Sequence, residues 1–209
     1  MNVYFDYNLL ERLCEQRAGR IPRSNDSRWV PDHNALEKIY EAFKDGRLML
    51  ITCREDSLEE FVAYAPDAIQ SYNDIRRHLP EHMVAKFGYF DSLKHGELLI
   101  APWGDYAFGC GPYGGGPQSH YELLAKIREA VGNEKPISSK DDRDPRHLMH
   151  SILYRCDYFL TMDYKTIVDK LSPLPVVLDK YLQAHGFSLN VITPSELLAR
   201  LEGRTPRAT

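Results

Sequence analysis

The sequence predicts an α/β fold built on a central, mostly parallel sheet. Short apolar runs of strand type alternate with amphipathic stretches of helical length, which is the order expected of parallel strands joined by crossover helices. The strand-like runs are apolar throughout, as in strands that helices cover on both faces. A sheet with helices wound around it is therefore the expected architecture.

We expect four strands, at residues 3–5, 48–52, 158–160 and 188–192. We expect seven helices, at residues 8–16, 33–45, 57–78, 120–131, 146–155, 165–171 and 194–201. The last helix has the clearest start, because Thr193 supplies an N-cap hydroxyl, Pro194 the first helical residue and Glu196 the carboxylate of a capping box. This motif is structural.

The segment from about residue 79 to residue 119 departs from the sheet pattern. Residues 97–101 are a candidate for a further strand, and the glycine- and proline-rich stretch 102–118 after them predicts an irregular loop. The segment is either a lid whose aromatic side chains stack on bases, or an insertion whose aromatic side chains pack against the body, and we favour the second. Its glycines do not form a phosphate-binding loop, because no Lys-Ser/Thr pair follows them.

Length and composition indicate one compact domain. The chain has 209 residues, 43% of them hydrophobic, which is enough for a sizeable core over residues 1–203, with 204–209 as a frayed tail. No run approaches the roughly 18–20 apolar residues that a membrane span needs. The first strand begins too early to leave room for a signal peptide, so we expect a soluble, cytoplasmic protein with no membrane partner.

Net charge and cysteine spacing exclude further classes. The formal charge of −4 means that any affinity for nucleic acid must come from local basic patches or from a bridging metal ion. The four cysteines have no C-x-x-C spacing, which argues against a zinc knuckle and against a disulfide framework. We expect buried or incidental thiols at Cys14, Cys53, Cys110 and Cys156.

Acidic residues stand at the ends of predicted strands. Asp6 ends the first strand, Asp163 follows the strand at 158–160, and Asp144 opens the helix before that strand. Open α/β sheets bind their ligands at the carboxyl ends of the strands. Carboxylates that converge there repel one another, so a divalent cation among them is the simplest explanation of the pattern.

The order of these acids resembles the PIN-domain family. The segments concerned are VYFDYN, TCREDSLEEF, DPRHLMHSILYRCDYFLTMD and NVITPSELL, and the resemblance is strongest at the first strand and over residues 144–198. It implies a Rossmann-like three-layer fold and a nuclease, mostly of RNA, whose acids hold Mg²⁺ or Mn²⁺. By resemblance, the ligands and catalytic residues are Asp6, Glu60, Asp144 and Asp163.

Three of the four acids, Glu60, Asp144 and Asp163, also have a structural interpretation. Glu60 completes a capping box with Ser57, in which case Glu59 or neither residue is the ligand. Asp144 meets the positive end of a helix macrodipole, and Asp141 and Asp142 could share that role or replace Asp144 at the metal.

Asp163 serves equally well as the N-cap of the helix at 165–171. Asn8 and Thr161 flank two of the acids, where they either orient ligands and waters or satisfy local backbone groups. His147 and His150 we interpret as ordinary helix-face residues. Two clusters of basic residues either contact a phosphate backbone or are simply solvated: Arg20, Arg23 and Arg28 in one, and Arg76, Arg77 and His78 in the other.

The predicted function is therefore metal-dependent endoribonuclease activity on an RNA substrate. Small PIN-like nucleases include toxins, so an antitoxin protein is a candidate partner, and a homodimer is left open. One alternative is a PIN-like module that binds nucleic acid or protein without catalysis. A second is a phosphatase of the haloacid-dehalogenase kind, because the segment FDYN partly resembles the opening motif of that superfamily. Asn8, however, stands where that motif needs an aspartate.

Overall fold

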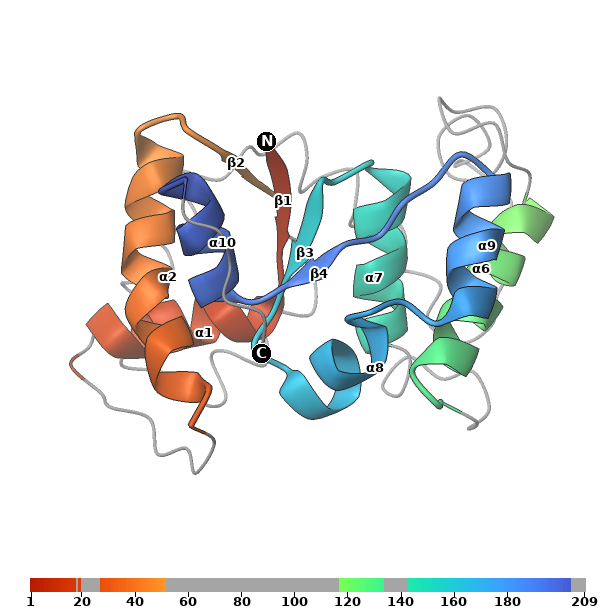
Figure 1. Ribbon diagram of the computed structural model, residues 1–209, viewed down its shortest axis with the longest axis horizontal. Helices are drawn as coiled ribbons and strands as arrows, with labels where there is room; N and C mark the ends of the chain where they lie inside the picture. Colours follow the sequence, from red (N-terminus) through yellow and green to blue (C-terminus); the bar gives the residue numbers. More distant parts are fainter. Residues whose placement is uncertain (18, 20–26, 52–116, 134–142, 204–209) are drawn as a thin grey trace.

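The computed structural model describes residues 1–17, 19, 27–51, 117–133 and 143–203 (Figure 1). Its centre is a four-stranded sheet with every strand parallel and the order β2-β1-β3-β4. The strands are β1 (Asn2–Phe5), β2 (Met49–Ile51), β3 (Tyr158–Leu160) and β4 (Val191–Ile192). The predicted α/β fold with a parallel sheet is confirmed.

Helices cover both faces of the sheet. One face packs against α1 (Tyr7–Arg17), α2 (Trp29–Lys44) and α10 (Pro194–Leu201). The other face packs against α7 (Arg143–Leu153), and α6 (Pro117–Ala130) and α9 (Val176–Ala184) lie beyond it (Figure 1). In the described residues the sheet therefore lies between two groups of helices, and the group that contains α7 is two helices deep.

Strand residues alternate between the two hydrophobic cores. In β1, Val3 and Phe5 belong to the core under α1, α2 and α10, whereas Tyr4 belongs to the core under α7. This alternation is the two-residue period of a strand. Because both faces of the sheet are covered, successive residues of the strand are all apolar. By the same alternation, Asp6 continues the face of Tyr4, which is the face that α7 covers.

Among the predicted elements that the structure describes, two match their predicted bounds to the residue and the others differ at one or both ends. β3 and α10 agree with the prediction, and the capping box is present, with Glu196 Oε2 accepting a hydrogen bond from Thr193 N at 2.9 Å. The predicted strand 188–192 is ordered as a strand only at its last two residues. The predicted helix 165–171 consists of a π-helix, Tyr164–Val168, followed by the short α8, Asp169–Leu171.

The sequence analysis missed α9. Pro173 and Pro175 precede it, and the first two residues of the helix, Val176 and Val177, are 67% and 59% exposed, so its start lacks the usual amphipathic pattern. The predicted helix 57–78 and the glycine-rich stretch up to residue 116 lie outside the described residues.

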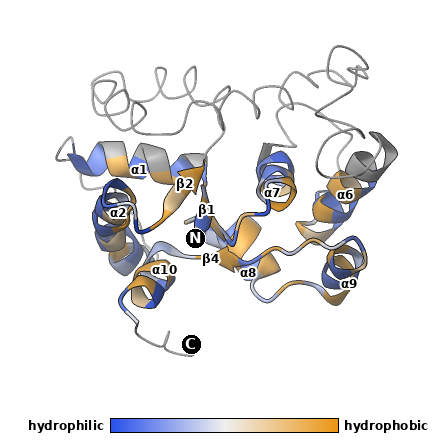
Figure 2. Ribbon diagram, turned by 90° about the horizontal axis from the view of Figure 1, so that it is seen from above, coloured by the Kyte–Doolittle hydropathy of each residue, from blue (hydrophilic) through white to orange (hydrophobic). Residues whose placement is uncertain are grey.

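The helices carry both hydrophilic and hydrophobic residues, whereas β2 is uniformly hydrophobic (Figure 2). Along the described ranges, no helix combines the length and the apolar character needed to cross a membrane. Cys156 fits the expectation of a buried thiol, and its burial raises the pKa of that thiol to about 12.

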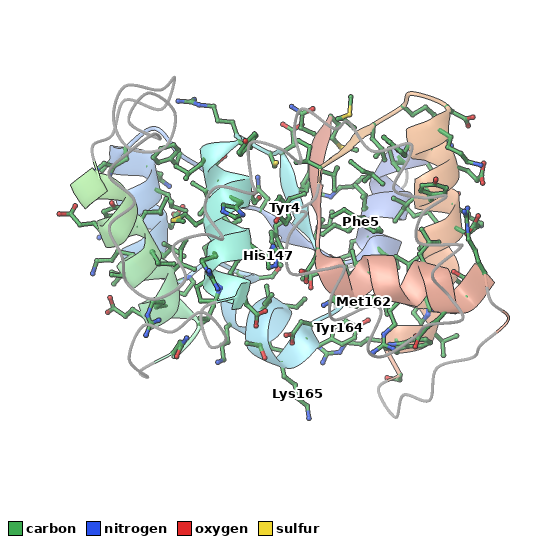
Figure 3. All side chains as sticks on the ribbon, turned by 180° about the vertical axis from the view of Figure 1, so that it is seen from behind. Tyr4, Phe5, His147, Met162, Tyr164 and Lys165 are labelled. Atoms are coloured by element: carbon green, nitrogen blue, oxygen red, sulfur yellow. The ribbon has the colours of Figure 1, made fainter. Side chains whose placement is uncertain are left out.

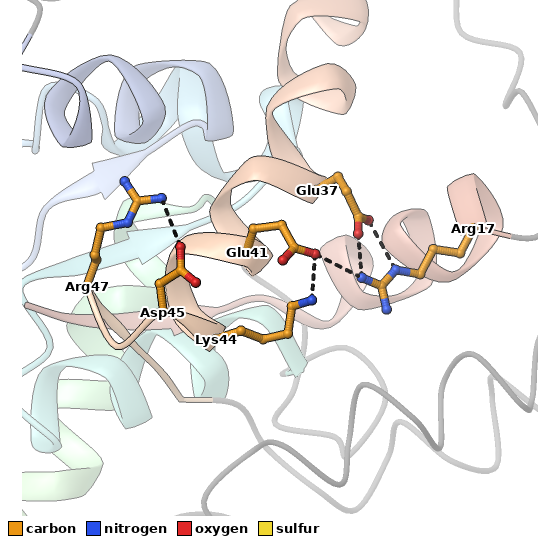
Figure 4. Close-up of polar contacts among 6 residues, drawn as sticks. All are labelled: Arg17, Glu37, Glu41, Lys44, Asp45 and Arg47. Atoms are coloured by element: carbon orange, nitrogen blue, oxygen red, sulfur yellow. Dashed lines mark hydrogen bonds and ion pairs between the residues drawn. The ribbon is translucent and has the colours of Figure 1, made fainter.

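An exposed group of ion pairs joins α1 to α2 (Figure 4). Arg17 binds Glu37, with Nε 3.1 Å from Oε2, and also approaches Glu41 at 4.0 Å; Lys44 pairs with Glu41 at 2.6 Å. Exposed pairs of this kind contribute about 0–1 kcal/mol each. The packing of Leu9 and Leu13 beneath α2 is therefore the main link between the two helices.

Candidate functional site

Asp6 lies where β1 ends at the carboxyl edge of the sheet. Its backbone N–H donates to Leu160 O at 3.1 Å, which extends the pairing of β1 with β3 by one residue. Its side chain is 6% exposed, and its Oδ2 accepts a hydrogen bond from the Thr161 hydroxyl at 2.6 Å. The carboxylate is thus held against the end of the neighbouring strand.

The Thr161 hydroxyl joins three of the predicted site residues. It donates to Asp6 and accepts from the backbone N–H of Asp163 at 3.0 Å and from Asn8 Nδ2 at 3.3 Å. A hydroxyl has one donor and two acceptor positions, so these three contacts use it fully. Thr161 is completely buried, which protects the arrangement from competing water.

Asp163 is half-buried and caps the π-helix that follows it. Its Oδ1 accepts from Thr166 N at 2.9 Å, and its carbonyl oxygen accepts from Ile167 N at 3.2 Å and Val168 N at 2.9 Å. The N-cap interpretation is therefore confirmed. The second carboxylate oxygen, Oδ2, makes no hydrogen bond to the described part of the chain.

Asp144 lies in the first turn of α7 and is half-buried. α7 runs antiparallel to the strands and leads into the start of the parallel strand β3. Its N-terminus therefore lies at the same carboxyl edge of the sheet as Asp6 (Figure 1). The macrodipole interpretation of this carboxylate fits its place in the first turn.

A complete metal site is not formed by the described residues. Among them, no three His, Cys, Asp or Glu side chains gather closely enough to hold a metal ion. Glu60 lies outside the described residues, as do the alternatives Glu59, Asp141 and Asp142 and the cap residue Ser57.

Oxygen donors suited to a hard cation are nevertheless present at this edge. The amide oxygen of Asn8 is buried and has no hydrogen-bond partner among the described residues, although its Nδ2 contacts Thr161. Leaving a buried acceptor without a donor costs about 1–3 kcal/mol. The carboxylates of Asp6 and Asp163 and this amide oxygen are the ligand types that Mg²⁺ and Mn²⁺ prefer.

An aromatic residue of β1 contacts a histidine of α7 and an aromatic residue of β3. The Tyr4 hydroxyl lies 2.7 Å from His147 Nδ1 (Figure 3), and the Tyr4 ring stacks on Phe159. His150 is completely buried, and its burial, with His147 and Arg146 nearby, sets its pKa well below 6.5. Both histidines therefore lie in the core and not on an exposed helix face.

The sequence analysis did not identify Asp32. This residue is 2% exposed, and its two oxygens accept from the Tyr164 hydroxyl at 2.5 Å and from Ser195 N at 2.6 Å. An aspartate in the first turn of a helix is commonly explained by the macrodipole. Since both partners are far away in the sequence, no spacing pattern could have pointed to them.

Arg28 is the one residue of the predicted basic clusters that the structure describes. Its guanidinium pairs with Asp169 at 2.6 Å and lies over the Tyr164 ring at 4.2 Å. Arg20, Arg23, Arg76, Arg77 and His78 lie outside the described residues.

Comparisons of the chain with family models, with curated proteins and with solved structures found no match. The resemblance to PIN domains therefore stays a prediction made from the residues.

Proposed function

We propose that this protein is a metal-dependent endoribonuclease whose site lies at the carboxyl edge of the sheet. The observation that supports the proposal most strongly is the buried Thr161 hydroxyl, which bonds to Asp6 and to the backbone of Asp163. These aspartates follow β1 and β3, which are adjacent parallel strands. Such an edge is where α/β sheets place their ligands.

The donor set suits phosphodiester cleavage. Asp6, Asp163, Asp144 and Glu60 would hold Mg²⁺ or Mn²⁺, which supplies an activated water and offsets the negative charge that develops on the leaving oxygen. Thr161 fixes Asp6 Oδ2 by donating to it. The buried amide oxygen of Asn8 adds a neutral acceptor beside the same hydroxyl.

RNA is the substrate that we propose, and an antitoxin-like inhibitor is a partner compatible with a small nuclease. The net charge of −4 makes a bridging cation useful, because the protein as a whole does not attract a polyanion.

The second candidate is a PIN-like binding module without catalysis. One observation favours it: Asp6 and Asp163 each have a structural partner, in the Thr161 hydroxyl and the Thr166 amide respectively. Both carboxylates would then be explained without a metal ion. RNA binding without turnover is the behaviour that this candidate predicts.

Cleavage of a mixed pool of structured and single-stranded RNA tests the proposal. Wild type and Asp6→Asn are purified by one protocol and assayed with Mn²⁺, with Mg²⁺ and with EDTA. We expect metal-dependent cutting by the wild type and its loss in the variant. Cutting that is absent from both proteins while RNA is still bound would favour the binding module. Equal cutting by both proteins would contradict the proposal that Asp6 belongs to the catalytic site.

A further inference from the structure

The segment that contains Asp163 is attached to a distant helix by a buried carboxylate. Asp32, in the first turn of α2, accepts a hydrogen bond from Tyr164, the residue directly after Asp163. Its other oxygen accepts from Ser195 N in the first turn of α10. We name these three residues, Asp32, Tyr164 and Ser195, the Asp32 network.

We infer that the Asp32 network positions Asp163 for the reaction, so that Asp32 and Tyr164 are positioning residues of the site. This inference rests on the proposed function. Tyr164 points back into the protein, whereas Lys165 beside it points away from the body (Figure 3). The side chain immediately after Asp163 therefore anchors the backbone at this point by its hydrogen bond to Asp32.

The π-helix passes this restraint on to the Asp163 carboxylate. Thr166 N bonds to Asp163 Oδ1, and the amides of Ile167 and Val168 both bond to the Asp163 carbonyl oxygen. Because side chain and backbone of Asp163 are bonded to this one turn, a shift of the turn displaces the carboxylate. Single π-helical turns are often found at functional sites.

Burial distinguishes the Asp32 hydrogen bonds from the ion pair that also reaches this segment. Arg28, the residue before α2, pairs with Asp169, but the two side chains are 46% and 48% exposed. Exposed pairs are weak because water and salt screen them. Asp32 is 2% exposed, so its hydrogen bonds are shielded from competing water.

The test compares Asp32→Asn and Tyr164→Phe with Ile39→Val, a buried apolar control about two turns further along the same helix, with no part in the Asp32 hydrogen bonds. The first readout is hydrogen exchange at the Thr166 amide in metal-free protein. We expect exchange at least about tenfold faster in the two network variants than in the control at matched global stability. Equal exchange in all three proteins would overturn the inference.

The second readout is the Mn²⁺ concentration that gives half-maximal RNA cleavage. We expect it to rise about 10- to 100-fold in both network variants, as when an outer partner of a metal ligand is lost, with the KM for RNA unchanged. A rise in KM alone, or a rise in the control as well, would contradict positioning. Wild type that shows no metal-dependent cleavage would refute the proposed function, and faster Thr166 exchange would still establish that Asp32 holds the segment.

Discussion

Two buried polar residues, Thr161 and His150, lead to specific predictions about single substitutions. Thr161 makes three hydrogen bonds at the carboxyl edge, and His150 lies in the core beneath it. The sequence placed Thr161 beside the acids but could not show that Asp6 and Asp163 share its hydroxyl. That contact depends on the register of β1 against β3, which brings Phe5 opposite Leu160.

Replacing Thr161 with Val keeps the shape of the side chain and removes its hydroxyl. We expect a loss of about 1–3 kcal/mol in the free energy of unfolding, because Asp6 and the Asp163 amide each lose a buried partner. Denaturant titration followed by circular dichroism measures it. Thr161→Ser, which keeps the hydroxyl, is the control, and a Val variant as stable as the Ser variant would argue against this role.

His150 predicts a pH dependence of stability. Its pKa lies well below 6.5 in the folded protein, so the unfolded chain takes up a proton first as the pH falls. The contribution of neutral His150 to the free energy of unfolding is therefore present above pH 6.5 and is lost as the pH falls below it. This contribution decreases by about 1 kcal/mol between pH 7.5 and pH 5.5. In His150→Gln this part of the decrease should disappear.

His185→Gln is the matched control for that experiment, since His185 is exposed. The control should show the same pH dependence as the wild type. If the His150 variant does so too, burial of His150 is not the cause of the decrease.

The π-helix after β3 is the element that distinguishes the structural from the catalytic interpretation of Asp163. As an N-cap, Asp163 needs only a side-chain oxygen that accepts from Thr166 N. As a metal ligand it needs its negative charge. The sequence could predict both roles for this residue, but the structure was needed to show that its capping interaction occupies only Oδ1.

Two substitutions separate these roles. Asp163→Asn keeps a good N-cap and removes the charge, so we expect the free energy of unfolding to stay unchanged. Loss of an outer partner of a metal ligand lowers activity roughly 10- to 100-fold, and we expect this variant to lose more cleavage than that. Asp163→Ala should lose cleavage and also about 1 kcal/mol of stability. Thermal unfolding and RNA cleavage measure the two effects. An Asn variant that retains full cleavage would assign Asp163 to the structural role alone.

At the scale of the whole molecule, the alternation of apolar runs and helical stretches was sufficient to predict a parallel α/β sheet. β3 and α10 were predictable to the residue, because a short apolar run and a capping box mark them locally. The start of α9 has exposed valines after prolines and gave no such signal. The Asp32 network was not predictable, because it joins α2, the π-helix and α10, which meet only in the folded chain.

The central claim is that the carboxylates at this edge hold a divalent metal ion. Calorimetric titration of Mn²⁺ into wild type and into Asp6→Asn tests it most directly, with RNA absent. We predict saturable binding by the wild type that is lost, or at least about tenfold weaker, in the variant. No saturable binding by the wild type, or equal binding by both proteins, would contradict the claim.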